Sequence, residues 1–376
     1  MTECRVDLIY GNFKLGFEDF GISRYHLEIH KRLEDKVSIN WISYKPTKFG
    51  TIGRLLNMYI KYPITIVGKT RENAIIHILS PWFSHILLYP KIVDSKKTIV
   101  TFFDVEPSIM FSYSRVLLHW YLCRKGIMKS KRIITISNFA KSEIIRFLGY
   151  NYPEENIVVV HEGVDRNIFH KIEGRDIIAE KLKKEKLNFS EKTKIVLFVG
   201  SEQPRKNFKR VLQAFYKVKK NSNFPVKLLK IGKAESKSYR KESIETARKL
   251  GILEDVLFLD YVSDKELVMY YNIADCLVLP TLYEGGFALP VLEAMSCECP
   301  VITSNIPPLL ELTDRKGAIF VDPYNVDELT KAILELLNER VDIENLIREG
   351  IQIAEKYSWE KSAFRLYKVY KELQRE

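Results

Sequence analysis

The chain has 376 residues and a formal net charge of +11. This length exceeds what one hydrophobic core usually supports, so two domains are expected. Hydrophobic residues make up 46% and charged residues 28%, which is ordinary for a globular protein and excludes a disordered one. No run approaches the ~20 apolar residues of a membrane-spanning helix, and the start of the chain does not have the pattern of a secretion signal.

The cysteines give no framework of cross-links. Their number is odd and no two form a C-x-x-C pair, which argues against disulfides and against a zinc site. We interpret them as small packing residues of a reduced, cytoplasmic protein. The five are Cys4, Cys123, Cys276, Cys297 and Cys299.

Short apolar runs alternate with amphipathic segments through both halves of the chain. Buried runs of this kind, separated by helices, are typical of parallel sheets covered by helices. In the first half the expected strands are 6–10, 37–44, 75–79, 98–103, 132–137 and 157–161. In the second half they are 194–200, 226–231, 256–259, 276–280, 301–304 and 318–321.

Three helix starts carry capping residues. Ser263 followed by Glu266 fits a capping box, Asn325 followed by Glu328 is its asparagine analogue, and Ser137 is expected to cap a third helix. A polar, charged segment around 165–190 precedes a new strand, which places a domain boundary there.

The most informative segment is 281–304, TLYEGGFALPVLEAMSCECPVITS. Glu284 leads into Gly285 and Gly286, which let the backbone approach a ligand closely. Pro290 suits the first turn of a helix. The start of that helix offers unpaired N–H groups and a positive dipole end to a phosphate, and Glu293 lies about one turn further in, where it can accept bonds from sugar hydroxyls. The simpler alternative is an ordinary strand–loop–helix with two surface glutamates.

A second segment, 200–207, reads GSEQPRKN and lies between a predicted strand and a helix. Arg205 can form a forked contact with a diphosphate and Lys206 can supply a point charge. Cations at a helix start are unfavourable against the helix dipole, so two together indicate an anion. The alternative is a basic helix start that faces solvent.

Together these segments resemble the retaining glycosyltransferases of family 4, the glycosyl transferases group 1, and in particular their mannosyltransferases. Members typically show E-G-F-G-L-P-x-L-E-A-M, with seven residues between the glutamates, whereas eight residues lie between Glu284 and Glu293 here. Either the loop holds one extra glycine or the role of the first glutamate has changed; we favour the extra glycine. The resemblance implies the GT-B fold, which consists of two Rossmann-like α/β domains facing a central cleft.

The resemblance also implies roles for individual residues. Glu284 would orient the sugar, Glu293 would hold ribose or sugar hydroxyls, and Arg205 and Lys206 would bind and neutralise the departing diphosphate. Backbone groups of the loop and helix start would bind phosphate and sugar; these residues are Gly285, Gly286, Phe287, Ala288 and Leu289.

Three segments of the first half can be compared with the family, two of which match it and one of which departs from it. The segment 16–25, GFEDFGISRY, resembles its first glycine loop, so Gly21 is expected near the donor. Relatives read T-x-H-D after the fourth strand; here Phe103 replaces the histidine while Asp104 remains as a candidate catalytic residue. The segment 159–169 resembles the turn between the family's domains, in which Gly163 and Asp165 are structural.

On this basis we expect an N-terminal acceptor-binding domain over 1–170 and a nucleotide-sugar-binding domain over 171–355. A C-terminal helix over 356–376 would return to the first domain.

The positive charge gathers in two stretches of the first half, 45–71 and 115–132, where lysines and arginines are interleaved with bulky apolar side chains. This pattern favours helices lying on an anionic membrane surface, at the inner face of the cell membrane. A core helix with a solvated basic face is the plain alternative. Single-stranded nucleic acid also binds such surfaces, but the sequence contains no nucleic-acid-binding motif. We therefore expect no nucleic acid as a partner.

The sequence therefore predicts a retaining, metal-independent hexosyltransferase with no cofactor. The favoured donor is GDP-mannose, followed by UDP-glucose or a UDP-N-acetylhexosamine, and the acceptor is a glycan or a lipid-linked glycan. Two alternatives remain open: a nucleotide-sugar epimerase, which shares the architecture, and a non-catalytic protein that binds nucleotide sugars or glycans.

Overall fold

The computed structural model describes residues 4–11, 21–44, 56–89, 97–105, 114–174, 177, 187 and 189–376. The chain forms two compact units. The first comprises Met1–Glu162 together with Trp359–Glu376, and the second comprises Gly163–Ser358. The segment 12–20, which includes most of the expected glycine loop, and the segment 45–55 lie outside the described residues.

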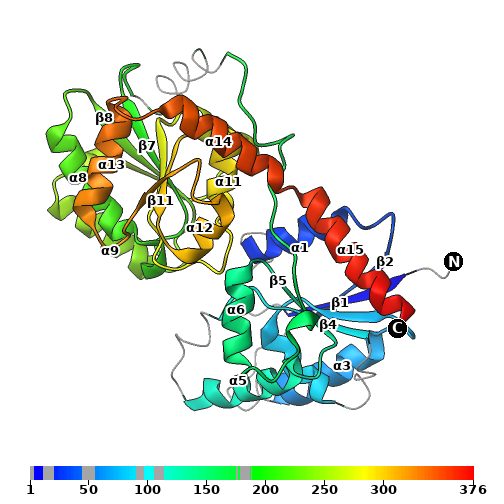
Figure 1. The fold of residues 1–376 in the computed structure, drawn as a ribbon. Helices are drawn as coiled ribbons and strands as arrows, with labels where there is room; N and C mark the ends of the chain where they lie inside the picture. The colour runs from blue at the N-terminus through cyan, green and yellow to red at the C-terminus, as the bar shows by residue number, and fades with distance from the viewer. Residues whose placement is uncertain are drawn as a thin grey trace. The chain divides into compact units, whose positions relative to one another are not determined.

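The first unit is built on a six-stranded parallel sheet of order β2-β1-β3-β4-β5-β6 (Figure 1). Its strands are β1 (Arg5–Gly11), β2 (Ser38–Tyr44), β3 (Ile75–Ile78), β4 (Thr98–Thr101), β5 (Arg132–Thr135) and β6 (Ile157–Val159). Its helices are α1 (Gly21–Lys31), the π-helical turn η1 (Asn57–Lys61), α3 (Tyr62–Lys69), η2 (Pro81–Leu88), α5 (Ser114–Ile127), α6 (Asn138–Phe147), η4 (Glu154–Asn156) and α15 (Trp359–Arg375).

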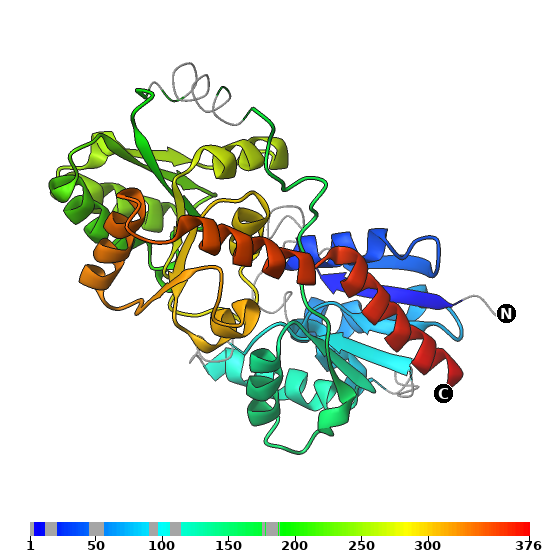
Figure 2. The ribbon, with the colours of Figure 1, turned by 45° about the horizontal axis from the view of Figure 1, so that its top comes forward.

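The second unit holds another six-stranded parallel sheet, of order β12-β11-β10-β7-β8-β9. Its strands are β7 (Lys194–Val199), β8 (Val226–Ile231), β9 (Val256–Leu259), β10 (Cys276–Leu279), β11 (Val301–Ser304) and β12 (Ile319–Val321). Its helices are η6 (Pro204–Lys206), α8 (Phe208–Asn221), α9 (Lys237–Lys249), η7 (Leu253–Asp255), α10 (Asp264–Ile273), α11 (Leu289–Ser296), α12 (Pro307–Thr313), α13 (Val326–Leu337) and α14 (Ile343–Lys356). Helices cover both faces of this sheet (Figures 1 and 2).

Both sheets confirm the prediction of two Rossmann-like domains. Each expected strand is present with its ends shifted by at most a few residues, because the apolar runs that predicted them are the buried strands of the sheets. The strands β4, β5 and β6 each end two residues earlier than expected, at Thr101, Thr135 and Val159. The caps are also confirmed: Ser137 accepts from Ala140, Ser263 forms a full capping box with Glu266, and Asn325 accepts from two N–H groups.

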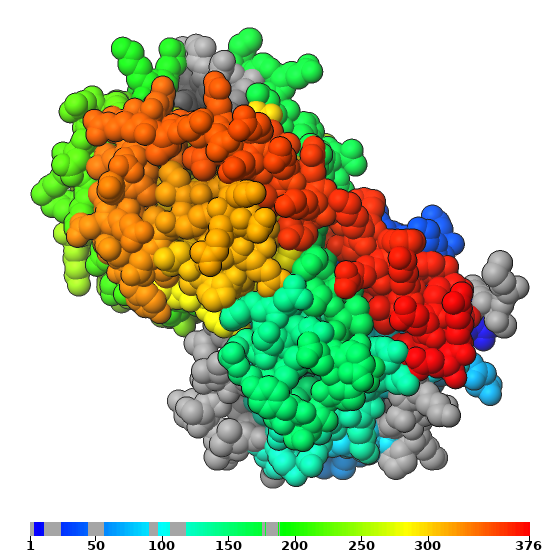
Figure 3. All heavy atoms as spheres, in the orientation of Figure 1, coloured from blue at the N-terminus to red at the C-terminus, as the bar shows by residue number. Residues whose placement is uncertain are grey.

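The C-terminal helix α15 belongs to the first unit and packs beside α1 (Figures 1 and 2). In the space-filling view α15, drawn in red, lies at the surface of its unit, as α13 and α14, drawn in orange, do in theirs (Figure 3). The Tyr370 hydroxyl is 2.7 Å from His77 Nδ1 and 3.0 Å from His30 Nε2. All three side chains are fully buried, so a polar network ties this helix to β3 and α1.

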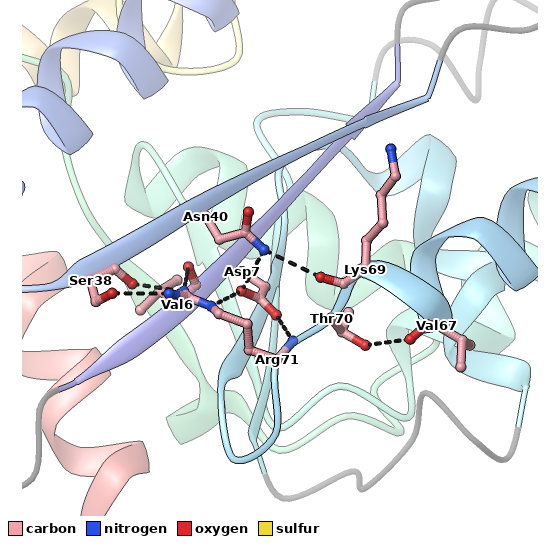
Figure 4. Close-up of polar contacts among 8 residues, drawn as sticks. All are labelled: Val6, Asp7, Ser38, Asn40, Val67, Lys69, Thr70 and Arg71. Atoms are coloured by element: carbon pink, nitrogen blue, oxygen red, sulfur yellow. Dashed lines mark hydrogen bonds and ion pairs between the residues drawn. The ribbon is translucent and has the colours of Figure 1, made fainter.

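An ion pair with a buried carboxylate joins β1, β2 and the residue Arg71 near the edge of the first sheet (Figure 4). Asp7 on β1 is fully buried, and it accepts from Arg71 Nε at 2.7 Å and from the Arg71 backbone N–H at 2.6 Å. The same guanidinium donates to the carbonyl oxygens of Val6 and Ser38, each at 2.8 Å. Arg71 belongs to the basic stretch 45–71, but this network occupies its guanidinium, so its charge is largely matched by Asp7 rather than left for anionic lipid.

Candidate functional site

The second sheet reverses its strand order between β7 and β10. These two strands are neighbours, with Cys276 opposite Val196 and Leu277 opposite Leu197, yet the chain proceeds from β7 toward β8 and from β10 toward β11. The connections that leave their carboxyl ends therefore diverge, and in open α/β sheets ligands bind at such a switch point. Both motifs singled out in the sequence follow these two strands, 200–207 after β7 and 281–289 after β10.

The connection after β7 forms a short basic turn. Pro204–Lys206 is a 3-10 turn, and Asn207 then adopts a left-handed conformation with φ 62° before α8 begins. The Asn207 side chain is buried and donates to the carbonyl oxygens of Pro280 and Pro323, at 2.8 and 2.7 Å. Asn207 thus joins the basic turn to the end of β10.

The two connections are also joined through the backbone of Arg205. Its carbonyl oxygen accepts from the Leu282 N–H at 2.7 Å and from the Thr281 hydroxyl at 3.0 Å. These bonds use only the main chain of Arg205. Its guanidinium makes separate contacts, and its Nε donates to Gln203 Oε1 at 2.9 Å.

Glu284 lies against both cations of the turn. One carboxylate oxygen accepts from Lys206 Nζ, and the other is 3.5 Å from an Arg205 guanidinium nitrogen. The Glu284 side chain is only 7% exposed, whereas those of Lys206 and Arg205 are 15% and 30% exposed. A nearly buried carboxylate is therefore held by two partly exposed cations, and an incoming anion can bind the same two cations.

Gly286 and Pro290 shape the start of α11. Gly286 has a φ of 153°, a region that side chains rarely adopt, which confirms the expectation that this loop needs a glycine. Pro290 occupies the first turn of α11, also as expected. Ala288 is the N-cap and offers no side-chain acceptor, so the positive end of the helix lies next to the loop 284–288, whose residues are all buried.

Glu293 lies further along α11 and is buried. Its Oε2 accepts from the Tyr271 hydroxyl at 2.9 Å. Burial raises the pKa of Tyr271 well above its ordinary value, and the neighbouring Glu293 charge raises it further. Tyr271 thus stays protonated and donates, which fixes the orientation of the Glu293 carboxylate.

The remaining candidates lie in the first unit. Gly21 is the first residue of α1, and Asp104 follows β4 at a half-buried position. Phe103, which replaces the family's histidine, is buried with its ring edge-on to Tyr25 and His26, at 5.0 and 5.5 Å between centroids. The phenylalanine therefore fills an aromatic core position.

One charged network of the second unit is not predicted from the sequence. Glu202 and Lys230 have fully buried side chains, and Glu202 Oε1 lies 2.6 Å from Lys230 Nζ and 2.8 Å from Arg240 Nε. Arg240 also pairs with Asp260 at 2.7 Å. Burial lowers the pKa of Lys230, and the Glu202 carboxylate opposes this shift. Glu202, Lys230 and Asp260 lie at the carboxyl ends of β7, β8 and β9, the edge at which a parallel sheet binds ligands. A lysine within the apolar strand VKLLKI was the signal available in the sequence.

The comparisons with known proteins bear on the family and the fold of the chain. Residues 179–353 match the model of the family described as glycosyl transferases group 1. The chain is 26% identical to the O-antigen chain mannosyltransferase B of Escherichia coli, over 97% of this chain and 100% of that one. It is 28% identical to the O-antigen chain mannosyltransferase RfbU of Salmonella typhimurium, over 66% of each chain.

Among solved structures, HepE of Anabaena, determined in complex with UDP and glucose, superimposes with a TM-score of 0.79 at 15% identity. The match covers 98% of this chain and 100% of that one, and at this identity it shows the fold. Sequence relatives and fold lead to the same conclusion: the chain is a glycosyltransferase with the GT-B fold, and its residues 179–353 resemble the glycosyl transferases of group 1.

Proposed function

We propose that this glycosyltransferase moves a hexose, with mannose favoured, from a nucleotide-sugar donor to a glycan or lipid-linked acceptor with retention of anomeric configuration. The observation that carries the proposal is the meeting of Arg205, Lys206 and Glu284 at the switch point of the second sheet. Two cations and a helix start at one place suit the diphosphate of such a donor.

In this proposal the diphosphate takes over the partners of Glu284. Phosphate oxygens bind Arg205 and Lys206, and Glu284 turns toward the hydroxyls of the sugar. Backbone N–H groups of Gly285, Gly286, Phe287, Ala288 and Leu289 bind the phosphate next to the sugar. Glu293, already oriented by Tyr271, accepts bonds from ribose or sugar hydroxyls.

The reaction then needs positioning and charge stabilisation rather than a protein nucleophile. The bond between the anomeric carbon and the phosphate oxygen breaks, and the diphosphate leaves with the bonding electrons, stabilised by Arg205 and Lys206. The acceptor hydroxyl forms its new bond on the same face, and its proton passes to a phosphate oxygen of the donor. Because the two side chains supply the positive charge, we propose that no metal is required. Asp104 is proposed to bind the acceptor hydroxyl.

The choice of sugar rests on the relatives. Two of them are described as mannosyltransferases of O-antigen chains, which favours GDP-mannose as the donor and a surface or lipid-linked glycan as the acceptor. HepE was solved with UDP and glucose, so UDP-glucose is the second candidate donor. A UDP-N-acetylhexosamine remains third.

A transfer assay tests this proposal. The purified protein is incubated with each nucleotide sugar, with and without a chelator, and a lipid-linked glycan acceptor. NMR of the product gives the anomeric configuration. Retained configuration and a rate unaffected by the chelator support the proposal. An inverted product, or activity that the chelator abolishes while the protein stays folded, contradicts the corresponding part of it.

We also propose that the first unit binds an anionic bilayer, at the inner face of the cell membrane. None of the described helices is long and apolar enough to cross a membrane. However, the helical segment 56–69 exposes three apolar side chains at four-residue spacing, which are Leu56, Ile60 and Ile64. Exposed lysines accompany them at Lys61 and Lys69, and this combination suits anionic lipid.

Helix α5 carries a second surface of the same kind. Leu118 and Tyr121 are 63% and 53% exposed, Lys125 continues the same helical face, and the exposed Lys129 follows in the turn after the helix. Other cations of the stretch 115–132 are engaged: Arg124 donates to the Leu148 carbonyl, and Lys131 and Arg132 pair with Glu376.

Liposome sedimentation tests the membrane proposal. The double variant Ile60→Ser, Ile64→Ser should lose binding to vesicles that contain anionic lipid, and the wild type should not bind neutral vesicles. Ile177→Ser, which changes an isoleucine that is 75% exposed in the second unit, is the matched control and should bind normally. Equal binding by the double variant and the control would contradict the proposal.

A further inference from the structure

A cluster of potential metal ligands lies in the first unit, separate from the candidate donor site. One ring nitrogen each from His85 and His119 and the sulfur of Cys123 lie within 4.8 Å of one another, and all three residues are buried. His119 and Cys123 are one helical turn apart on α5, so they face the same side, and their Nε2 and Sγ atoms are 3.3 Å apart. Tetrahedral zinc ligands are separated by about 3.3–3.8 Å, given bond lengths of ~2.0–2.3 Å.

His85 supplies an independent observation. Its Nε2 lies 3.2 Å from the Met58 carbonyl oxygen, which sets this nitrogen as the N–H donor. Its Nδ1 is buried and has no hydrogen-bond partner among the residues that the structure describes. A buried lone pair without a donor costs free energy unless something occupies it. A metal ion coordinated by Nδ1 would satisfy it.

The surroundings hold the ligands in place, as the outer shell of a metal site does. The second ring nitrogen of His119, Nδ1, is 2.8 Å from the Tyr59 hydroxyl, and its ring stacks on Trp82 with an interplanar angle of 17°. The Trp82 carbonyl oxygen lies 3.0 Å from His119 Nε2 and accepts from the Cys123 thiol at 3.4 Å, so an oxygen that can ligate a metal lies at the same centre.

The backbone also brings η2 and α5 unusually close. A side chain at Gly126 would place its Cβ 1.9 Å from the Ser84 carbonyl oxygen, so only glycine permits this approach. The Ser84 hydroxyl, in turn, donates to the Cys123 carbonyl oxygen at 2.8 Å. These two contacts fix the distance between the element that carries His85 and the one that carries His119 and Cys123.

We propose that His85, His119 and Cys123 form a structural site for a zinc ion. The sequence predicts no zinc site because no two cysteines form a pair, whereas this site combines Cys123 with His119 of the same helix and His85 of η2. Two imidazoles and a thiolate suit Zn²⁺, and they also suit Cu⁺. The experiment must therefore distinguish these two ions. On binding, Cys123 releases its thiol proton to solvent and His119 carries its proton on Nδ1, donated to Tyr59. The ion would then hold the segment that carries Tyr59 and Met58 against α5.

Cobalt substitution tests the site directly. Purified full-length protein, stripped of metal by a chelator, is titrated with Co²⁺ and followed by absorbance, then back-titrated with Zn²⁺ or, anaerobically, with Cu⁺. We expect one tetrahedral Co²⁺ per chain with a thiolate-to-cobalt charge-transfer band. Zinc should displace it, and zinc should also raise the unfolding temperature. The assignment to zinc would be overturned if Cu⁺ displaced Co²⁺ more strongly than zinc did and zinc did not raise the unfolding temperature.

Four variants complete the test. Cys123→Ser should abolish the charge-transfer band, whereas Cys4→Ser, a change at another buried cysteine of the same unit, should keep it. His85→Gln retains the thiol, and it should weaken Co²⁺ binding by more than about 100-fold, since loss of an outer-shell partner alone costs about 10- to 100-fold. Tyr59→Phe should fall in that smaller range. If the wild type shows no charge-transfer band, or if His85→Gln binds Co²⁺ as the wild type does, the proposal is wrong.

Discussion

Lys206 and Glu284 form an ion pair although they are 78 positions apart in the chain. The pair joins the connection after β7 to the connection after β10, across the point where the strand order of the second sheet reverses. Arg205 approaches the same carboxylate from the other side. The protein therefore holds its own anion at the place where the proposed donor diphosphate would bind.

Replacing Lys206 tests the role of this pair. Lys206→Ala should weaken binding of the donor and of its nucleoside diphosphate by about 10- to 100-fold, because a hydrogen bond to a charged group contributes about 1.5–3 kcal/mol. Lys209→Ala is the control, since this lysine of α8 is 63% exposed and pairs with the exposed Glu242 of α9. Calorimetric titration measures both. Equal affinities for the two variants would count against the phosphate site.

Asn207 should be required for the shape of the basic turn. Asn207→Gly keeps the left-handed conformation but leaves the carbonyls of Pro280 and Pro323 without the amide that bonds them. We expect a loss of about 2–4 kcal/mol in the free energy of unfolding, since an unsatisfied buried group costs about 1–3 kcal/mol. Asn207→Ala should be less stable by a further ~1 kcal/mol because of its positive φ. Urea unfolding compares the two, and an alanine variant as stable as the glycine variant would show that the backbone relaxes.

Variants of Glu293 and Tyr271 distinguish a role of Glu293 in binding from a structural role. Glu293→Gln keeps an acceptor for the Tyr271 hydroxyl but removes the charge, so it should fold normally and lower kcat/KM for transfer by more than about 10-fold. Tyr271→Phe removes the donor to a carboxylate that is 4% exposed, so it should lower the free energy of unfolding by about 1–3 kcal/mol. Transfer at the wild-type rate by Glu293→Gln would remove this residue from the proposed site.

The buried histidines of the first unit predict a loss of stability in mild acid. Burial lowers the pKa of His26 and His77 well below the ordinary value, and it lowers the pKa of His30 to about 4. Because the unfolded chain binds these protons more readily, the stabilisation is complete above pH ~6.5 and is lost as the pH falls from 6.5 toward 4. His30 alone should account for about 2 kcal/mol by pH 5.

Urea unfolding at pH 7.5 and pH 5.0 measures this effect. The midpoint of the first unit's transition should fall at the lower pH, and the fall should be smaller in His30→Asn. An unchanged midpoint in the wild type would mean that these histidines are protonated in the folded protein.

The strands and the caps could be predicted because their signals are local. A run such as CLVL in β10 is apolar on both faces, and the Ser263 capping box needs only the three residues that follow it. The switch-point motifs were found for the same reason, since Arg205 and Lys206 are adjacent and Glu284 lies in a glycine loop. Their meeting, however, depends on which strands pair, and that information is not local.

Other groupings depend entirely on the tertiary structure. Glu202 and Asp260 follow β7 and β9, and Lys230 lies in β8, so only the pairing of these strands brings the three together. His85 joins His119 and Cys123 only because Gly126 lets two helical segments approach. The occupied guanidinium of Arg71 also shows why a count of basic residues overestimates a membrane-binding surface.

Calorimetric titration of the purified wild type and Lys206→Ala with GDP, GDP-mannose, UDP and UDP-glucose tests the central claim most directly. The account predicts that one nucleoside diphosphate and its sugar bind the wild type without added metal, and that the Lys206 variant binds both about 10- to 100-fold more weakly. If every nucleotide bound the variant as tightly as the wild type, or none bound the wild type, the switch point between β7 and β10 would not be the donor site.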